Sequence, residues 1–270
     1  MSRTDPSLKY VITTSRRTDP ELVERARRWA ERLGRPLVDR ADRSLAQICE
    51  GEGIEAVLTV TAERIGLVIP ADGVEYFFHP SMARTRIRNI IRGSGDPMVT
   101  AMGLSRGDSV LDCTLGRATD ATVASWVVGE EGCVVGYEAH PLLAALTIDG
   151  LANYEIDGAG VQEAMRRIDA RHGDCREVLP GLQSDSFDVV YFDPFFGEMV
   201  ERSQAMMPLR RIGLHAPIPR ETYEQASRVA RRAIVVKQRR GEELPNVPEP
   251  DSVVAGGGSR IEYLVFDPAT

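Results

Sequence analysis

The sequence predicts an α/β fold, with a mostly parallel sheet closed by an antiparallel last strand and preceded by a small α/β unit. From residue 109 onward, near-continuous apolar strands alternate with helices, which is typical of a parallel sheet covered on both faces. Residues 252–266 contain two short apolar runs around a glycine-rich turn, which predicts a terminal hairpin. A chain of 270 residues is long enough for one large domain and a small companion.

The small unit is predicted from the first 80 residues. A strand at 10–15 is followed by a helix at 18–34, for which Thr18 and Glu21 suggest a capping box and Gly34 a stop. Three short strands are expected between 55 and 79. We place the domain border near residue 95, which gives an N-terminal domain of residues 1–95 and a larger domain of residues 96–270.

The larger domain is expected to follow a basic helix at 80–93. Its predicted elements, in chain order, are a strand at 109–113, a helix at 120–129, a strand at 133–138, helices at 141–151 and 159–168, a third strand within 167–174, a fourth strand at 187–193, a helix at 220–232, a strand at 233–238, and the hairpin strands at 252–255 and 261–266.

Composition narrows the class of protein. Hydrophobic residues make up 43% and charged residues 27%, as in an ordinary globular protein, and no apolar run is long enough to span a membrane. The polar N-terminus lacks a secretory signal, so we expect a cytoplasmic protein without a membrane partner. Neither the four cysteines nor the four histidines have metal-ligand spacing, so we expect no metal. The oligomeric state stays open.

The ends of the predicted strands contain the candidate ligand-binding residues, because open α/β sheets bind ligands there. Asp112 ends the first strand of the larger domain and Gly116 lies in the following turn. The dinucleotide pattern GxGxxG is absent from this turn. An acid at that place suits the cationic amino-acid end of S-adenosylmethionine better than it suits a pyrophosphate.

The next two strand ends fit the same cofactor. Glu138 follows Asp112 by 26 residues, about where an acid accepts the two ribose hydroxyls of a bound nucleoside. Asp174 and Cys175 follow the third strand, where a carboxylate could accept the adenine amino group and the backbone could add contacts.

The fourth strand end indicates the chemistry. Asp193 and the carbonyl of Pro194 can accept the two N–H bonds of an exocyclic amine, and the proline contributes no competing donor. Phe195 or Phe196 can stack on the base and hold it in line with the methyl group. We therefore expect Asp193, Pro194, Phe195 and Phe196 to form a methyl-acceptor site for an amine.

Taken together, the segments 110–121, 138–151, 189–196, 234–238 and 259–266 resemble the bacterial small-subunit rRNA guanine-N2 methyltransferases. The chain is more similar still to a related group of uncharacterised S-adenosylmethionine-dependent methyltransferases, which share "TTSRR" and "FFHPSMA". The resemblance implies the class I methyltransferase fold, with a mostly parallel seven-stranded sheet. It also implies cofactor contacts at Thr119, Asp120, Glu138, Ala139, Asp174, Cys175 and Asp193.

The sequence departs from the rRNA enzymes at three places. They usually have a second glycine where Ala118 stands and a proline where Gly197 stands, and the N-terminal region matches them poorly. The cofactor and fold therefore follow from the resemblance more directly than the RNA target does.

Net charge is −7, yet residues 81–106 hold five arginines against Asp96, and residues 202–240 hold ten Lys or Arg against two Glu. These segments favour RNA as the substrate, with Arg84, Arg86 and Arg88 as phosphate contacts, and solvated helix faces are the alternative explanation for the same charges.

Three alternatives remain at this stage. Asp193, Lys237 and Glu262 suggest part of the Lys-Asp-Lys-Glu set of ribose 2′-O-methyltransferases, although we favour Lys237 as the charged end of a strand. The second alternative is a small-molecule methyltransferase and the third is a non-catalytic nucleotide-binding protein. Carbon methylation through a cysteine is excluded because the fourth strand end has none.

Overall fold

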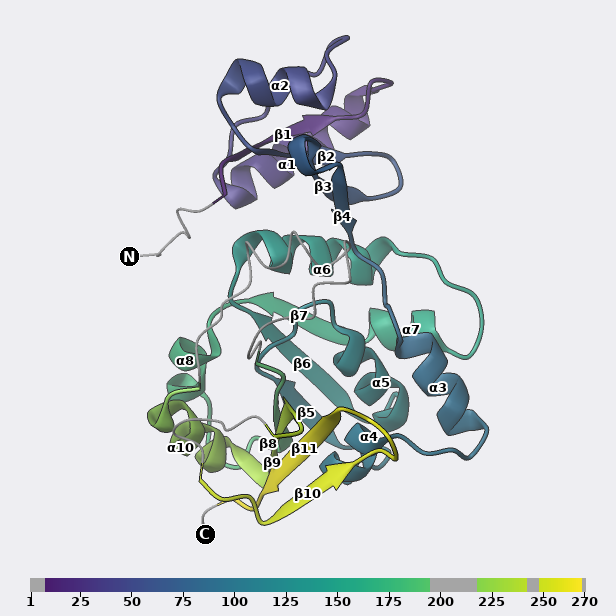
Figure 1. Ribbon diagram of the computed structural model, residues 1–270, viewed down its shortest axis with the longest axis vertical. Coiled ribbons are helices and arrows are strands. Elements are labelled where there is room, and N and C mark those ends of the chain that lie inside the picture. The colour runs from purple at the N-terminus through teal and green to yellow at the C-terminus, as the bar shows by residue number, and fades with distance from the viewer. Residues whose placement is uncertain (1–7, 195–217, 242–247, 269–270) are drawn as a thin grey trace. The chain divides into compact units, whose positions relative to one another are not determined.

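The computed structural model describes residues 8–194, 218–241 and 248–268 (Figure 1). Contacts group these residues into two compact units. Unit 1 contains residues 8–79 together with 140–154, and unit 2 contains residues 80–139 and 155–194 and the described residues from 218 onward. No helix in these ranges is long and apolar enough to cross a membrane.

Unit 1 is built on a four-stranded sheet in the order β1-β2-β3-β4. Strand β1 (Tyr10–Thr14) is parallel to β2 (Ala56–Val60), whereas β3 (Ile65–Ile69) and β4 (Val74–Phe77) continue the sheet antiparallel. Helices α1 (Pro20–Leu33) and α2 (Leu45–Glu52) form the crossover between the two parallel strands. The three strands expected between residues 55 and 79 are confirmed.

The N-terminus of α1 differs from the expectation. Asp19 is the capping residue, and its carboxylate accepts the N–H of Leu22 at 2.8 Å, so the capping box predicted at Thr18 and Glu21 is wrong. Pro20 explains the shift, because proline favours the first helical position and makes the residue before it the cap. The capping box lies instead on α2, between Ser44 and Gln47.

Helix α6 (Pro141–Asn153) belongs to unit 1 by its contacts. Leu142, Leu143 and Leu146 are fully buried in the same apolar cluster as the β1–β4 strands. Arg25 of α1 also forms an ion pair of 2.8 Å with buried Asp149. The chain therefore enters unit 1 directly after Glu138 and Ala139 and returns to unit 2 at residue 155. The domain border near residue 95 remains a prediction.

Unit 2 is built on a seven-stranded sheet in the order β10-β11-β9-β8-β5-β6-β7, whose last two strands in the sequence, β10 and β11, are yellow in Figure 1. Its strands are β5 (Ser109–Asp112), β6 (Cys133–Glu138), β7 (Ile168–His172), β8 (Phe187–Phe192), β9 (Ala230–Arg239), β10 (Ser252–Ala255) and β11 (Ile261–Phe266). Strands β7, β6, β5, β8 and β9 are parallel, and β11 is antiparallel to both of its neighbours. The expected sheet and its terminal hairpin are confirmed.

The helices of unit 2 connect these strands and cover them. They are α3 (Ala83–Ile91), α4 (Pro97–Met102), α5 (Thr119–Val128), α7 (Val161–Arg166), α8 (Cys175–Val178) and α10 (Arg220–Val229), with a short 3-10 turn at Leu179–Gly181.

The two faces of this sheet differ in character. Val190 and Phe192 of β8 pack with residues of α8 and α10 in one apolar cluster. Successive side chains of a strand point to opposite faces, so Tyr191 lies on the other face, with its strand neighbours Asp112 and Val235. Lys237 shares that face because it is two residues after Val235. Polar side chains of β5, β8 and β9 are therefore brought together on the face that α5 covers.

Candidate functional site

The loop after β5 is held close against β6. Leu115 donates its backbone N–H to the carbonyl of Tyr137 at 2.9 Å, and its side chain occupies the space beside Gly136. A Cβ at Gly136 would lie 2.4 Å from a methyl carbon of Leu115, so a larger residue here would displace the Leu115 side chain. Gly116 and Ala118 both adopt left-handed backbone angles, with φ of 51° and 55°. The departure at Ala118 therefore puts an alanine where glycine is conformationally favoured.

Glu138 joins this loop from the end of β6. Its Oε2 accepts the backbone N–H of Gly116 at 3.0 Å, and the residue is only 8% exposed. Two of the predicted cofactor residues therefore contact each other directly. Ala139 follows and is half-buried.

Asp112 is the most deeply buried acid of the site, with 2% exposure. Its carboxyl accepts the backbone N–H of Thr114 at 3.0 Å. Burial raises the pKa of Asp112 to about 8, and the nearby carboxylates of Asp120 and Asp193 add to that rise. A cation bound beside Asp112 would favour the ionised form.

The third strand end is next to the second. Gly173 donates its N–H to the carbonyl of Glu138 at 3.0 Å, and Asp174 then caps α8 by accepting the N–H of Arg176 at 2.9 Å. Partial burial would raise the pKa of Asp174, but its ion pair with Arg176 outweighs burial and lowers it. Cys175 is buried as the first residue of α8. The adenine contact of Asp174 and Cys175 remains a prediction.

The fourth strand end presents Asp193. Its backbone N–H donates to the hydroxyl of Thr114 at 2.6 Å, which ties the end of β8 to the loop after β5. Its side chain is 38% exposed, so a substrate can reach the carboxylate. Its Oδ2 lies 2.6 Å from the Nζ of Lys237. Pro194 is described, whereas the predicted stacking residues Phe195 and Phe196 lie outside the described residues.

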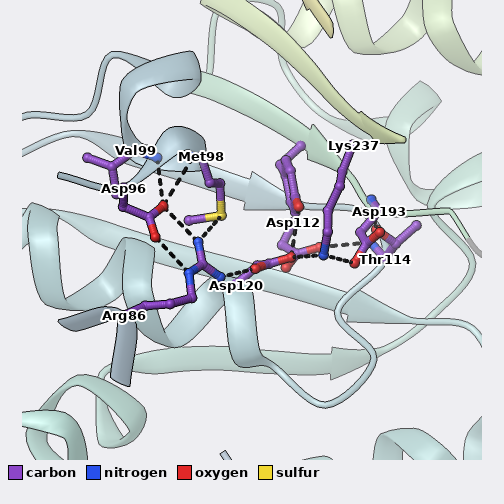
Figure 2. A network of polar contacts seen from close by, with 10 residues as sticks. Arg86, Asp96, Met98, Val99, Asp112, Thr114, Asp120, Asp193 and Lys237 are labelled. Atoms are coloured by element: carbon purple, nitrogen blue, oxygen red, sulfur yellow. Dashed lines mark hydrogen bonds and ion pairs between the residues drawn. The ribbon is translucent and has the colours of Figure 1, made fainter. Parts of the chain in front are cut away.

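Figure 2 shows that this contact is one end of a chain of alternating charges. Lys237 also donates to Oδ2 of Asp120 at 2.9 Å. Asp120 forms an ion pair with Arg86 through its other oxygen. Arg86 in turn binds both oxygens of Asp96, each at 2.8 Å. We call the five residues Asp96, Arg86, Asp120, Lys237 and Asp193 the charge chain.

Neighbouring groups fix the members of the charge chain in place. Asp96 caps α4 and accepts the N–H groups of Met98 and Val99 at 3.1 and 3.2 Å. The hydroxyl of Tyr191 donates to Oδ2 of Asp120 at 2.8 Å. The chain therefore spans from the cap of α4 to the exposed carboxylate of Asp193.

Mutual ion pairing sets the pKa values in the charge chain, whose two cations are Arg86 and Lys237. Burial would raise the pKa of Asp120, but Lys237 and Arg86 outweigh it and hold that pKa below its ordinary value. Burial would lower the pKa of Lys237, but Asp120 and Asp193 outweigh it and raise that pKa. Lys237 therefore stays protonated and cannot act as a base.

Several predicted roles change in this geometry. Lys237 lies near the end of β9, as the favoured interpretation has it, but its ammonium also contacts two carboxylates and its side chain is only 22% exposed. Asp120 was expected to contact the cofactor, and its carboxylate is already bound by Arg86, Lys237 and Tyr191. Thr119 beside it is half-buried. Cofactor contacts by Thr119 and Asp120 remain predictions.

The three arginines predicted to contact RNA differ from one another. Arg86 is bound by Asp96 and Asp120 and its side chain is 18% exposed. Arg88 is exposed and Arg84 is half-buried. Much of the second basic segment, 202–240, lies outside the described residues. Arg88 is therefore the best placed of the three for a phosphate, and the RNA contacts stay a prediction.

Sequence reasoning missed the charge chain, although two signals for it exist. Lys237 is one of only two lysines in a chain with 31 arginines, which suggests a position where a compact ammonium is required. Asp96 precedes Pro97, a pattern typical of a capping residue at a helix start. Neither signal shows that the two residues belong to one network.

The ribose-methylating set is not assembled in this sheet. Lys237 lies opposite Tyr263 on β11, whereas Glu262 lies opposite Gln238 and accepts its side-chain N–H at 2.7 Å. Because adjacent residues of a strand point to opposite faces, Glu262 lies on the other face from Lys237. Among the described residues, no group of three or more His, Cys, Asp or Glu side chains is arranged to hold a metal ion.

Comparisons with known proteins agree with this geometry. A family model described as "Putative SAM-dependent methyltransferase" matches residues 55–262. "Uncharacterized protein YpiP" of Bacillus subtilis is 38% identical over 227 residues, which cover 84% of this chain and 88% of that protein. Ribosomal RNA small subunit methyltransferase J of Pseudomonas aeruginosa is 31% identical over 253 residues, which cover 90% of both chains. That match extends over much of unit 1.

A solved structure also matches nearly the whole chain. The S-adenosylmethionine-dependent methyltransferase of Neisseria gonorrhoeae superposes with a TM-score of 0.64 at 19% identity and covers 96% of each chain. At this level of identity the likeness shows the fold alone.

Proposed function

Because the chain belongs to the S-adenosylmethionine-dependent methyltransferase family, we propose that it methylates an exocyclic amine of an RNA base, with guanine N2 of small-subunit rRNA as its target. The observation that supports this best is the half-exposed carboxylate of Asp193, which Lys237 fixes beside Pro194. The enzyme uses S-adenosylmethionine as its methyl donor.

The acceptor site suits an amine whose lone pair is delocalised into a ring. Such a nitrogen is a poor nucleophile until its N–H bonds are held by acceptors. The carboxylate of Asp193 can accept one N–H, and the carbonyl of Pro194 can accept the other, while the proline ring contributes no N–H that would compete. We propose that Phe195 or Phe196 completes the site by stacking on the base.

The residues at the first three strand ends fit the cofactor. When bound, S-adenosylmethionine supplies a methyl group on a positively charged sulfur. We propose that Asp112 accepts the cationic amino-acid end, that Glu138 accepts the ribose hydroxyls, and that Gly116 lets the loop backbone approach closely. Two features support this: Asp112 is buried at a pKa of about 8, where a cation would ionise it, and Glu138 already bonds the loop of Gly116.

Support for RNA as the substrate comes from a relative and from surface charge. The printed name of the Pseudomonas aeruginosa relative specifies small-subunit ribosomal RNA. Exposed Arg88 and half-buried Arg84 lie on α3, and we propose that they contact phosphates. A methyltransferase that acts on rRNA works where ribosomes are assembled, so we also propose a cytoplasmic location.

One observation favours the ribose alternative, namely the contact between Lys237 and Asp193. Two others oppose it: Glu262 lies on the opposite face, and Lys237 is held by two carboxylates that neutralise its charge. A lysine that activates a hydroxyl must present its charge to that hydroxyl. The small-molecule and non-catalytic alternatives have no comparable observation in the described residues.

The test is transfer of a labelled methyl group. The purified enzyme is incubated with labelled S-adenosylmethionine and either total RNA or a metabolite extract, and the RNA is then digested to nucleosides and separated. We expect label in N2-methylguanosine, with Asp193→Ala as a control that binds cofactor but transfers little. Label in a 2′-O-methylated nucleoside or only in the metabolite extract would contradict the proposal.

A further inference from the structure

Lys237 is the first polar residue after the buried segment 233–236 of β9. Its ammonium bridges Asp120 on α5 and Asp193 after β8, at 2.9 and 2.6 Å. Both contacts are to Oδ2 atoms, so each carboxylate keeps its Oδ1 for another partner. Oδ1 of Asp120 is bound by Arg86, whereas Asp193 is 38% exposed.

Further contacts hold Asp120, one of the two carboxylates that Lys237 bridges. Tyr191 and Arg86 fix Asp120, and Asp96 fixes Arg86 through two bonds of 2.8 Å. Asp96 is itself bound by the first backbone N–H groups of α4. The Lys237 ammonium is therefore held by contacts that lead to α3, α4, α5 and β8. Figure 2 shows Asp96, Arg86, Asp120 and Lys237 joined in this order.

We propose that Lys237 is a positioning residue for methyl transfer, which holds Oδ2 of Asp193 so that Oδ1 meets the substrate amine as an ionised acceptor. This inference rests on the proposed function, because it assigns a task to Asp193 in that reaction. Lys237 does not touch the substrate in this arrangement. It acts on the orientation and the charge of Asp193.

The ionised form of Asp193 depends on Lys237. The titratable and charged groups that surround the Lys237 ammonium come from five elements: Asp120, Asp193, Asp112, Tyr191, Tyr263 and Arg86. Partial burial raises the pKa of Asp193, Lys237 opposes that rise, and Asp120 adds to it. Without the ammonium, Asp193 would face Asp120 uncompensated and would hold its proton to higher pH. A protonated carboxyl is a poorer acceptor for the amine.

The experiment compares pH profiles of turnover. Lys237→Met removes the charge, Lys237→Gln keeps hydrogen-bond donors without charge, and Lys237→Arg keeps the charge in another shape. Arg232→Met is the matched control, because it removes a cation from the other end of β9, where it pairs with Asp108. Circular dichroism and the dissociation constant of S-adenosylmethionine check folding and cofactor binding for each variant.

We expect the acid limb of the profile to move up by about one pH unit or more in Lys237→Met and Lys237→Gln, since an opposite charge at this distance shifts a carboxyl by about 1–3 units. Turnover near pH 6 should fall on the order of tenfold, with the KM for the cofactor changed less than about threefold. Lys237→Arg should return the limb toward wild type. If Lys237→Met does not fold, Lys237→Gln decides the question.

A carboxyl titration by nuclear magnetic resonance, assigned with Asp193→Asn, gives a readout that needs no substrate. A higher pKa of Asp193 in Lys237→Gln supports the inference, and an unchanged pKa together with an unmoved acid limb overturns it. If the wild-type enzyme methylates no RNA, the proposed function fails, and the carboxyl titration still decides whether Lys237 controls Asp193. A shifted limb in Arg232→Met would also overturn the inference.

Discussion

The carboxylates at the two ends of the proposed active site have different kinds of partner. At the cofactor end, Asp112 and Glu138 are bound by backbone N–H groups of the loop after β5, and burial raises the pKa of Asp112 to about 8. At the substrate end, Asp120 and Asp193 are paired with Lys237, and Asp120 is paired with Arg86 as well.

This difference matches the charges of the two ligands. S-adenosylmethionine brings its own positive charges, so a buried acid without a built-in cation is a suitable partner for it. A base brings a neutral amine, so the acceptor carboxylate must be charge-balanced by the protein. We infer that the substrate end contains the protein's own cations, whereas the cofactor end receives its positive charge from the bound ligand.

The largest expected effect comes from removing Arg86, the cation that links Asp96 and Asp120 in the charge chain. Arg86→Met leaves Asp96 and Asp120 buried without their shared cation, which should lower the free energy of unfolding by about 3–5 kcal/mol. Urea unfolding measures this change. Arg88→Met, an exposed neighbour on the same helix, should change stability by less than about 0.5 kcal/mol. Equal losses in the two variants would show that the charge chain has no structural role.

Removing the acceptor tests the substrate end directly. Asp193→Ala should reduce turnover on the order of 10²–10³, because the lost contact is stronger in the transition state than in the ground state. Asp193→Asn should be milder, since an amide oxygen still accepts one hydrogen bond. Single-turnover rates with saturating cofactor measure both. A double-mutant cycle with Lys237→Gln should show losses that do not add, because the two residues are in contact.

The cofactor end is tested at Glu138. Glu138→Ala should weaken S-adenosylmethionine binding by roughly tenfold or more, because two ribose hydroxyls lose a charged acceptor. Calorimetry measures the affinity, and Glu131→Ala on the exposed surface is the control. Because Glu138 is buried and bonds Gly116, we also expect a loss of stability, unlike for a solvent-exposed strand end. An unchanged affinity would remove Glu138 from the cofactor site.

The pH dependence of stability tests whether Asp112, at the cofactor end, has the raised pKa that distinguishes it from the paired carboxylates of the substrate end. The pKa of Asp112 is raised to about 8 in the folded protein and is near 4 in the unfolded chain, so unfolding releases a proton between these values. Its contribution to stability is therefore present below about pH 4 and is lost as pH rises to about 8, by at most about 1.4 kcal/mol per pH unit. Asp112→Asn should flatten the pH dependence of urea unfolding between pH 5 and 8. An identical slope in both proteins would contradict the assignment.

The smallest effect concerns the RNA surface. Replacing Arg84 and Arg88 with Ser should reduce the salt dependence of RNA binding by a slope of about 0.9 or less per lost phosphate contact. Filter binding at several salt concentrations measures the slope, and cofactor affinity should stay the same. Arg86 is left in place because its loss would disturb the fold. An unaltered slope would favour a substrate other than RNA.

The sequence predicted the sheet of unit 2 well because apolar strands and turn residues are local signals. Asp112, Gly116 and Glu138 could be placed for a related reason, since parallel strands bring their carboxyl ends to one edge. The charge chain could not be predicted, because its members come from residues 86 to 237 and meet only through tertiary packing. The assignment of α6 to unit 1 was missed as well, because an apolar helix does not indicate in sequence which sheet it covers. The cap of α1 lies at Asp19, one residue after the predicted Thr18, because Pro20 takes the first helical position.

The charge chain also affects how the segments that it joins unfold locally. Arg86, Asp96 and Asp120 tie the starts of α4 and α5 to α3, and Lys237 extends the link to β9. None of these segments can unfold locally without separating buried opposite charges. Amide hydrogen exchange should therefore show α3, the first turn of α5 and the end of β9 opening as a single cooperative unit, and the acceptor carboxylate should keep its place through the ordinary local fluctuations of a strand end.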